Sequence, residues 1–151
     1  MSISWGESRS WSQSLPAAPT SATEARWFLR EVAKGQDLGI DLDAAALLTT
    51  EIAGNAVRHG SEPIGLRIGL EEEGLRVAVH DHGPGFDPDE ALGGGYGLSL
   101  VQQLASEWGV DRGADETEVW FRLHSRPEPG PSKKARSRRN PKAPAASRDR
   151  S

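Results

Sequence analysis

Alternating apolar residues between positions 64 and 79 constrain the fold of this chain more than any other feature. Two short runs carry an apolar side chain at every second position, and a turn segment with glycine at its end, residues 71–74, separates them. The alternating residues are Ile64, Leu66, Ile68 and Leu70 in the first run and Leu75, Val77 and Val79 in the second. A period of two residues places one side of each strand in a core. The runs therefore predict a β-hairpin whose apolar face other elements must cover.

The remaining periodicity predicts what covers that face. The expected elements are, in order, a strand at 11–15, a helix from Thr20 or Ser21 to Ala33, a helix from Asp41 to Arg58, the hairpin, a helix from about Gly97, and strands at 108–111 and 117–123. Asp41 can cap the second helix, and Gly60 can supply a left-handed C-cap. Trp108 and Trp120 are expected in the core. This order predicts an α/β fold, a two-layer sandwich in which a mixed, mostly antiparallel sheet is covered on one face by helices.

Charge and composition divide the chain into a body and two ends. Nine basic and twenty acidic residues lie up to position 124, whereas nine basic and two acidic residues follow it. Residues 125–151 contain no large apolar side chain and cannot offset the entropy of ordering, so we expect a disordered basic tail. Residues 1–10 are rich in serine and are also expected to be disordered. Residues 11–124 then form the single folded domain.

Features of membrane-bound or disulfide-stabilised proteins are missing from the sequence. There is no cysteine. The first ten residues lack the apolar stretch of a signal peptide, and no apolar run approaches the roughly 18 residues of a membrane span. We therefore expect a cytoplasmic protein. The basic tail could bind nucleic-acid phosphates weakly and without sequence preference, but a solvated tail is the simpler interpretation.

The end of the second predicted helix carries a polar face. At about 100° per residue, Glu51, Asn55 and Arg58 lie within about 60° of one another. Asparagine is a poor helix residue because its side chain competes for backbone hydrogen bonds, so its presence needs a reason. An amide oxygen suits Mg²⁺, and a carboxylate one turn earlier could accept a proton. A solvated helix face is the alternative, and His59 could either point at a phosphate or be structural.

A short loop, Asp81-His82-Gly83-Pro84-Gly85, follows the second strand of the hairpin. An ionised aspartate only accepts hydrogen bonds, so Asp81 can receive one from an exocyclic amine such as that of adenine. Gly83 and Gly85 let the backbone turn tightly and approach a flat ligand. An ordinary turn is the alternative.

A run of glycines opens the third predicted helix. Gly93, Gly94, Gly95 and Gly97 precede Leu98. Free backbone N–H groups and the positive end of the helix dipole favour a polyphosphate at such a place. A flexible linker before a helix is the alternative.

Taken together, the three segments resemble the N box and the two glycine boxes of the GHKL (histidine-kinase-like) ATPase superfamily. The likeness covers about Trp11 to Leu123. Within the superfamily the chain most resembles the small stand-alone anti-sigma factor serine/threonine kinases of Gram-positive bacteria and their actinobacterial relatives. The segments that carry this resemblance are residues 51–60, the DHGPG loop, the GYGLSLV helix start and the closing VWFRL.

This resemblance implies roles for the polar residues. Asn55 would ligate Mg²⁺, and Glu51 would be the catalytic base. Asp81 would bind the adenine amine in a pocket shaped by Gly83 and Gly85.

Further nucleotide contacts are implied around the phosphates and beside the base. The residues implied there are Arg58, His59, Gly93, Gly95, Gly97 and Leu98. Thr117 resembles the hydroxyl residue that usually bonds near the adenine-binding aspartate. Glu116 stands where the family often has glycine, so a tight backbone approach at Thr117 is in doubt.

The function implied by the resemblance is that of a magnesium–ATP-binding regulator. It would phosphorylate a serine or threonine of a STAS-domain anti-anti-sigma partner and could also sequester a sigma factor. A homodimer is implied as well, because the small stand-alone kinases are often dimers. Two alternatives stay open: a non-catalytic ATP-dependent binding module, and the detached catalytic domain of a split histidine kinase. Glu51 argues against a pure binding module, which would not need a carboxylate there.

Overall fold

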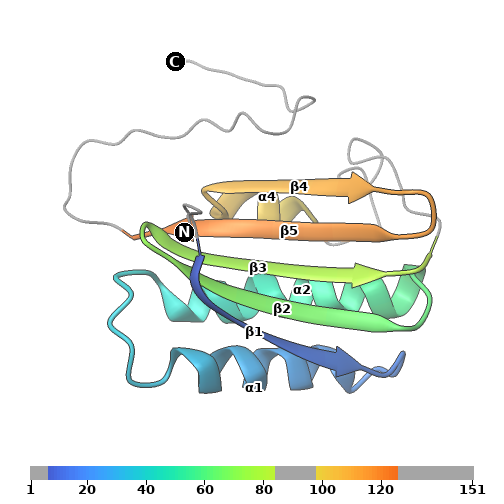
Figure 1. The fold of residues 1–151 in the computed structure, drawn as a ribbon, viewed down its shortest axis with the longest axis horizontal. Helices are drawn as coiled ribbons and strands as arrows, with labels where there is room; N and C mark the ends of the chain where they lie inside the picture. The colour runs from blue at the N-terminus through green and yellow to red at the C-terminus, as the bar shows by residue number, and fades with distance from the viewer. Residues whose placement is uncertain (1–6, 84–97, 126–151) are drawn as a thin grey trace, which may run out of the picture.

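The computed structural model describes residues 7–83 and 98–125, and Figure 1 shows how their helices and strands are arranged. The elements are β1 (Glu7–Leu15), α1 (Ser21–Ala33), α2 (Leu42–His59), β2 (Ile64–Glu71), β3 (Gly74–Asp81), α4 (Leu98–Leu104), β4 (Glu107–Arg112) and β5 (Thr117–His124). The predictions of disorder for residues 1–6 and 126–151 lie outside the described residues.

The five described strands form one sheet in the order β1-β2-β3-β5-β4. Every neighbouring pair in this part of the chain is antiparallel. The α/β two-layer fold is therefore confirmed. The expectation of a mixed sheet was wrong for these strands, because each connection between neighbours, including the long one from β3 to β5, reverses the chain direction.

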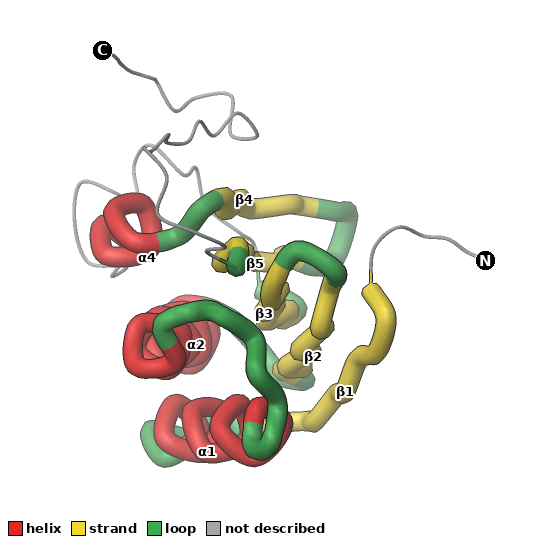
Figure 2. Tube along the Cα trace, turned by 90° about the vertical axis from the view of Figure 1, so that its left-hand side faces the viewer, coloured by secondary structure: helices red, strands yellow, loops and turns green. Residues whose placement is uncertain are grey.

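All three described helices cover the same face of the sheet, as Figure 2 shows. The strand register lines up the apolar positions on that face: Ile68 lies beside Val77, and Val77 lies beside Phe121. From the helices, Leu29 of α1 and Ile52 of α2 join the same core, and all five side chains are fully buried. Burying each such side chain stabilises the fold by about 1.5–3 kcal/mol relative to exposure. The core thus lies between the layers, as the alternating pattern predicted.

On the face of the sheet without helices, an aromatic ring packs between two arginine side chains. Trp120 projects there, with the guanidinium groups of Arg76 and Arg122 5.1 and 5.2 Å from its ring. A Cβ built on Gly109 of the neighbouring strand would lie 2.8 Å from this ring, so the indole packs directly on the β4 backbone. Trp108 lies in the core as predicted. The same expectation for Trp120 was wrong, because its register position faces away from the helices.

Arg122 also links three strands across that open face. Its Nε donates to Glu71 on β2 at 3.0 Å, and a second guanidinium nitrogen donates to Glu107 on β4 at 3.1 Å. Burial lowers the pKa of Arg122, but the hydrogen bond and charge of Glu71, together with Glu107, outweigh it and leave the pKa raised. The guanidinium therefore stays charged, and its two ion pairs connect β5 to β2 and to β4.

Both predicted boundaries of the folded domain need correction. Residues 7–10 were expected to be disordered, yet β1 begins at Glu7 and pairs with β2. An edge strand needs only backbone pairing on one side, so its serines do not prevent it. At the other end, Ser125 was assigned to the tail, but its backbone N–H donates to the Glu73 carbonyl at 2.7 Å.

The helix ends follow the sequence signals only in part. The Asp41 carboxylate accepts from the backbone N–H of Ala44 at 3.1 Å, which confirms the predicted cap of α2. Thr20 occupies the N-cap of α1, but its side chain makes no capping hydrogen bond with the described residues, and Ser21 instead donates to the carbonyl of Pro16. Gly60 is extended, with φ −101°, so the left-handed C-cap was wrong. Among the described helices, none is both long and apolar enough to cross a membrane.

Candidate functional site

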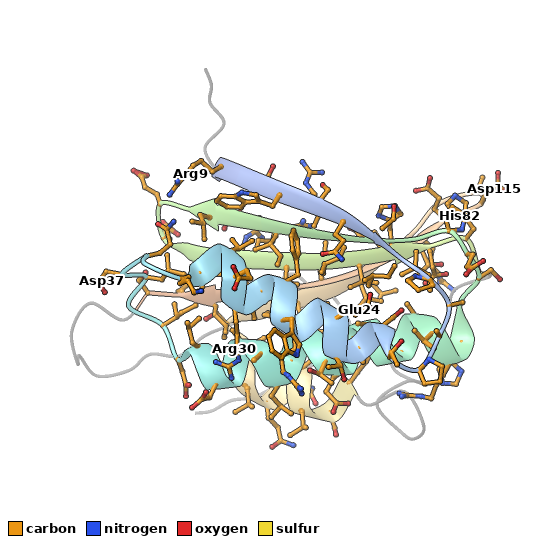
Figure 3. All side chains as sticks on the ribbon, turned by 90° about the horizontal axis from the view of Figure 1, so that it is seen from below. Arg9, Glu24, Arg30, Asp37, His82 and Asp115 are labelled. Carbon is orange, nitrogen blue, oxygen red and sulfur yellow. The ribbon has the colours of Figure 1, made fainter. Side chains whose placement is uncertain are left out.

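Of the predicted site residues that the structure describes, most come from two elements that end at the same end of the sheet. α2 ends at His59 and packs beneath β3, which ends at Asp81 (Figure 1). In Figure 3, the labelled side chains of His82 and Asp115 mark this end, and Arg9 lies at the opposite end. The two layers of the fold therefore bring the helix motif and the loop motif together.

Buried polar side chains are few in the described part of the chain. The described residues include five of them, namely Ser21, Thr49, Asn55, Asp81 and Thr117. Three of the five were predicted as site residues from the sequence. Burying a polar group is unfavourable unless it is hydrogen-bonded. A buried polar side chain without a partner is therefore a candidate for binding a ligand.

Asn55 is the clearest case. It lies in the C-terminal half of α2 and is only 2% exposed. Its Oδ1 is buried and has no hydrogen-bond partner among the described residues. Leaving such an acceptor unpaired costs about 1–3 kcal/mol of stability. Such an unpaired oxygen is suited to coordinate a hard cation, which would take the place of the missing hydrogen-bond donor.

The other polar residues of the helix motif become more exposed toward the end of α2. Glu51 is half-buried one turn before Asn55, whereas Arg58 and His59 are exposed. The guanidinium of Arg58 turns back along the helix, and a Cβ at Gly54 would lie 3.1 Å from its nitrogen. α2 is continuous through this stretch, so the predicted common face of Glu51, Asn55 and Arg58 holds.

Asp81 is buried at the end of β3, with 5% of its surface exposed. Its Oδ1 accepts a 2.6 Å hydrogen bond from the backbone N–H of Gly83. Thr117 lies directly opposite Asp81 in the register of β3 and β5, and its hydroxyl lies 3.5 Å from the Gly83 carbonyl. Asp81, Gly83 and Thr117 therefore form one buried cluster, as the sequence motifs had suggested.

Glu116 does not obstruct this cluster. Its side chain is 59% exposed and lies 4.0 Å from the ring of His82. The Glu116 side chain is thus directed into solvent rather than into the buried cluster.

These elements, in this order, match a known family of domains. A family model of the histidine kinase-like ATPase domain matches residues 15–123. The chain belongs to this family. At the level of the family, membership supports ATP as the ligand of the histidine kinase-like ATPase domain.

Solved structures give a second comparison. The chain is similar to the crystal structure of the RsbU and RsbW domains of Rv1364c from Mycobacterium tuberculosis, with a TM-score of 0.60 and 25% sequence identity. The similarity covers 80% of this chain and 34% of that chain, so the histidine kinase-like domain here spans about a third of the structure that it matches. A search of proteins with curated functions finds no significant match.

Of the predicted nucleotide contacts in and directly after the glycine loops of this histidine kinase-like ATPase domain, the structure describes only Gly83 and Leu98. Gly85, Gly93, Gly95 and Gly97 lie outside the described residues. Leu98 is the first residue of α4 and is fully buried in the core. Its described role is therefore to pack α4 against the domain.

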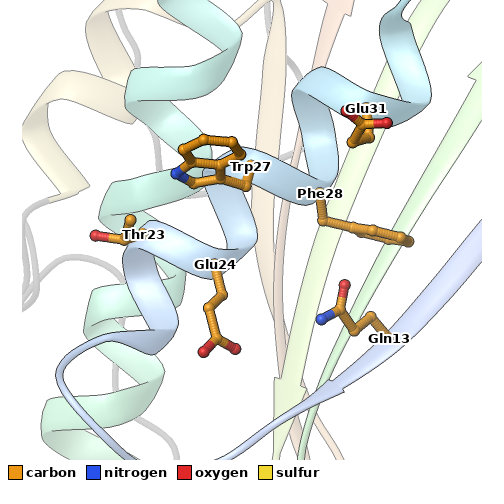
Figure 4. A pocket seen from close by; sticks show the side chains of 6 residues that line it. All are labelled: Gln13, Thr23, Glu24, Trp27, Phe28 and Glu31. Carbon is orange, nitrogen blue, oxygen red and sulfur yellow. The ribbon is translucent and has the colours of Figure 1, made fainter.

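A separate hollow lies between β1 and α1 (Figure 4). Its volume is about 470 Å³. The residues that line it are Gln13, Thr23, Glu24, Trp27, Phe28 and Glu31. None of the predicted site residues lines this hollow, so the candidate site of the histidine kinase-like domain is elsewhere, at the end of β3.

The donor set limits the kind of metal site that this domain could form. Among the described residues, no group of three or more histidine, cysteine, aspartate or glutamate side chains could hold a metal ion. Mg²⁺ takes few protein ligands and keeps water and phosphate oxygens. The buried Oδ1 of Asn55 fits such a site, in which a nucleotide supplies the other ligands.

Sequence analysis missed one participant in the site. It placed Gly60 at the end of α2 and in the resembling segment 51–60 but gave it no role in the site, whereas this residue packs against the carboxylate of Asp81. Its position directly after the helix motif was the available signal, and the contact depends on how α2 and β3 meet in space.

Proposed function

We propose that this protein binds magnesium–ATP between α2 and β3 and transfers the γ-phosphoryl group to a serine or threonine of a protein partner. The observation that carries the proposal is the buried, unpartnered Oδ1 of Asn55, because an acceptor kept at such an energetic disadvantage is suited to a cation. Bound Mg²⁺ would supply a positive charge that offsets the negative charge of the phosphates.

Recognition of the base would depend on Asp81. Its carboxylate is buried beside Gly83 and Thr117, and an ionised carboxylate can only accept hydrogen bonds. The exocyclic amine of adenine is a donor of the required kind. Gly83 would allow the ring to approach, with Gly85 completing the loop.

Transfer would depend on Glu51. It is half-buried and lies one helical turn before Asn55, so its carboxylate can face the terminal phosphate. The hydroxyl oxygen of the partner would form a bond to the γ-phosphorus as the bond to the ADP oxygen breaks, and the hydroxyl proton would pass to Glu51. Arg58 and His59, exposed at the end of α2, would contact the phosphates, together with Gly93, Gly95, Gly97 and Leu98.

The proposed partner is a STAS-domain anti-anti-sigma protein, with a sigma factor as a second target. Support comes from the resemblance to stand-alone anti-sigma kinases and from the similarity to a chain described by its RsbU and RsbW domains. A cytoplasmic location and a homodimer belong to the same proposal.

The test combines binding with transfer. Calorimetric titration with ATP is expected to show binding with MgCl₂ and much weaker binding with EDTA. Radiolabelled ATP is then mixed with the protein and with STAS proteins from the same genome, and label is expected on one of them. Magnesium-dependent binding without transfer to any STAS protein would favour the non-catalytic binding module. Transfer of the label to a histidine of another protein would favour the split histidine kinase. No binding of ATP would refute the proposal.

A further inference from the structure

Gly60 is not required by its own backbone conformation. It follows α2 with φ −101° and ψ −164°, a region that any residue adopts. The glycines that need a left-handed conformation in the described chain are others, such as Gly35 with φ 78°. A reason for glycine at position 60 must therefore come from what surrounds it.

What surrounds Gly60 is the carboxylate of Asp81. A Cβ built on Gly60 would lie 2.4 Å from Cγ of Asp81 and 2.6 Å from each carboxylate oxygen. Ordinary contacts of a Cβ are about 3.4–4 Å. The near equality of the two oxygen distances shows that the missing side chain of Gly60 points at the middle of the carboxylate. A methyl group at this position would occupy the same space as the carboxylate.

The carboxylate has little freedom to avoid such a methyl group. Oδ1 of Asp81 is held by the N–H of Gly83, and the side chain is almost fully buried. A Cβ at Gly83 would in turn lie 2.8 Å from Cα of Gly60, so the two glycines also touch. The loops that carry them are joined by a 2.9 Å hydrogen bond from the N–H of His82 to the carbonyl of Ser61. Moving the Gly60 segment and the Gly83 segment apart to make room for a methyl group would break this hydrogen bond.

We propose that Gly60 is a positioning residue for the base pocket: its bare Cα forms the wall that sets where the Asp81 carboxylate points. The proposal rests on the nucleotide binding proposed above. Adenine presents an amine donor at the position where guanine presents a carbonyl acceptor. An acceptor that is held in place can discriminate between the two bases. An acceptor that a methyl group has displaced discriminates less.

The test is Gly60→Ala, titrated by calorimetry with ATP and with GTP in MgCl₂. We expect ATP affinity to fall by about tenfold or more, near the loss expected when a hydrogen bond to a charged group is removed, with GTP affinity changing much less. The ratio of the two affinities should collapse. The matched control is Gly113→Ala in the turn between β4 and β5, where a Cβ would lie 3.8 Å from its nearest neighbour. An unchanged ATP affinity and ATP/GTP ratio in Gly60→Ala would overturn the proposal.

A second measurement separates this contact from general loosening and from the nucleotide proposal itself. Melting temperatures are compared for Gly60→Ala, Asp81→Ala and the double variant, without nucleotide. If Gly60 packs on the carboxylate, most of the destabilisation caused by Gly60→Ala should vanish when residue 81 is alanine. This holds even if the wild type binds no nucleotide, in which case only the proposed function fails. If Gly60→Ala does not fold, the double variant should regain folding. A double variant as unstable as Gly60→Ala alone would refute the contact and with it the positioning role.

Discussion

The hydroxyl of Ser125 donates a 2.7 Å hydrogen bond to the carbonyl oxygen of Leu38, which ties the end of β5 to the loop between α1 and α2. Together with the bond from its N–H to Glu73, this anchors the last described residue to two segments of the domain. The folded part of the chain therefore includes Ser125, which the change in composition had assigned to the tail.

Deletion of residues 126–151 should leave the domain intact. We expect the melting temperature to change by less than about 2 °C and ATP affinity by less than about twofold, because the deleted segment has no apolar periodicity. Deleting Ser125 as well removes two hydrogen bonds, each contributing about 0.5–1.5 kcal/mol, and should lower the melting temperature measurably. Scanning calorimetry of the two truncations tests this. A large loss of stability on removing 126–151 alone would mean that the tail packs on the body.

Asp81→Asn should weaken ATP binding about 10- to 150-fold. The substitution replaces one acceptor oxygen by a donor, which opposes the adenine amine, and a hydrogen bond to a charged group contributes about 1.5–3 kcal/mol. Calorimetric titration measures the affinity. Asp115→Asn, an exposed aspartate at the same end of the sheet, is the control and should bind like the wild type. Equal affinities for all three proteins would exclude Asp81 as the base contact.

Asn55→Leu should separate stability from binding. Leucine has a similar shape and no unpaired oxygen, so we expect the free energy of unfolding without ligand to rise by about 1 kcal/mol. Magnesium–ATP should no longer raise the melting temperature, because the proposed ligand oxygen is gone. Thermal melts with and without MgCl₂ and ATP measure both effects. A variant that magnesium–ATP stabilises as strongly as the wild type would rule out Asn55 as a ligand.

Glu51→Gln should reduce transfer with little effect on binding. Glutamine keeps the size and hydrogen bonding of the side chain but is not basic, and a general base typically contributes about 10²- to 10⁴-fold in rate. Single-turnover transfer from radiolabelled ATP to the partner measures the rate, and ATP affinity should stay within a few-fold. Glu24→Gln on the exposed surface of α1 is the control. Wild-type transfer by Glu51→Gln would remove Glu51 from the mechanism.

Arg122→Met should destabilise the sheet by about 1–3 kcal/mol, because it removes two ion pairs in a partly buried position and leaves Glu71 and Glu107 without this cation. Chemical denaturation measures the change, and Arg112→Met, an exposed arginine at the end of β4, should alter stability by less than about 0.5 kcal/mol. The pKa of Arg122 is raised, so its stabilising charge is present at all pH values below that raised pKa. The difference in stability between wild type and Arg122→Met should therefore not decline from pH 7 to pH 10. A decline over this interval would mean that the guanidinium loses its proton there.

The hairpin was predictable because its pattern is local. Alternation of apolar residues places β2 and β3 within two residues of their bounds in the structure. β1 escaped prediction over residues 7–10, because an edge strand pairs through its backbone and its side chains there carry no apolar pattern. Trp120 was misplaced for a different reason. An aromatic residue can cover the open face of a sheet when arginines shield it, and composition alone does not reveal this.

For the candidate site, the sequence supplied candidate residues but not the contacts between them. Asparagine inside a helix signalled a special position, and the buried Oδ1 of Asn55 agrees with that signal. The neighbourhood of Asp81 depends on tertiary structure. Thr117 faces it only because β5 inserts next to β3, and Gly60 touches it only because α2 and β3 end together. Contacts between segments that are distant in sequence cannot be read from either segment alone.

The direction of the outer elements has a consequence for how such a domain can be combined with others. β1 begins where Glu7 pairs with Glu71, and β5 ends where His124 pairs with Gly74, so both strands meet the hairpin turn at the end of the sheet remote from Asp81. Neighbouring termini at one surface favour insertion into longer chains, since both linkers leave on the same side. Further domains joined at these strand ends would lie away from the candidate site. The mycobacterial chain, of which the similar region makes up only 34%, is an instance of such a multidomain arrangement.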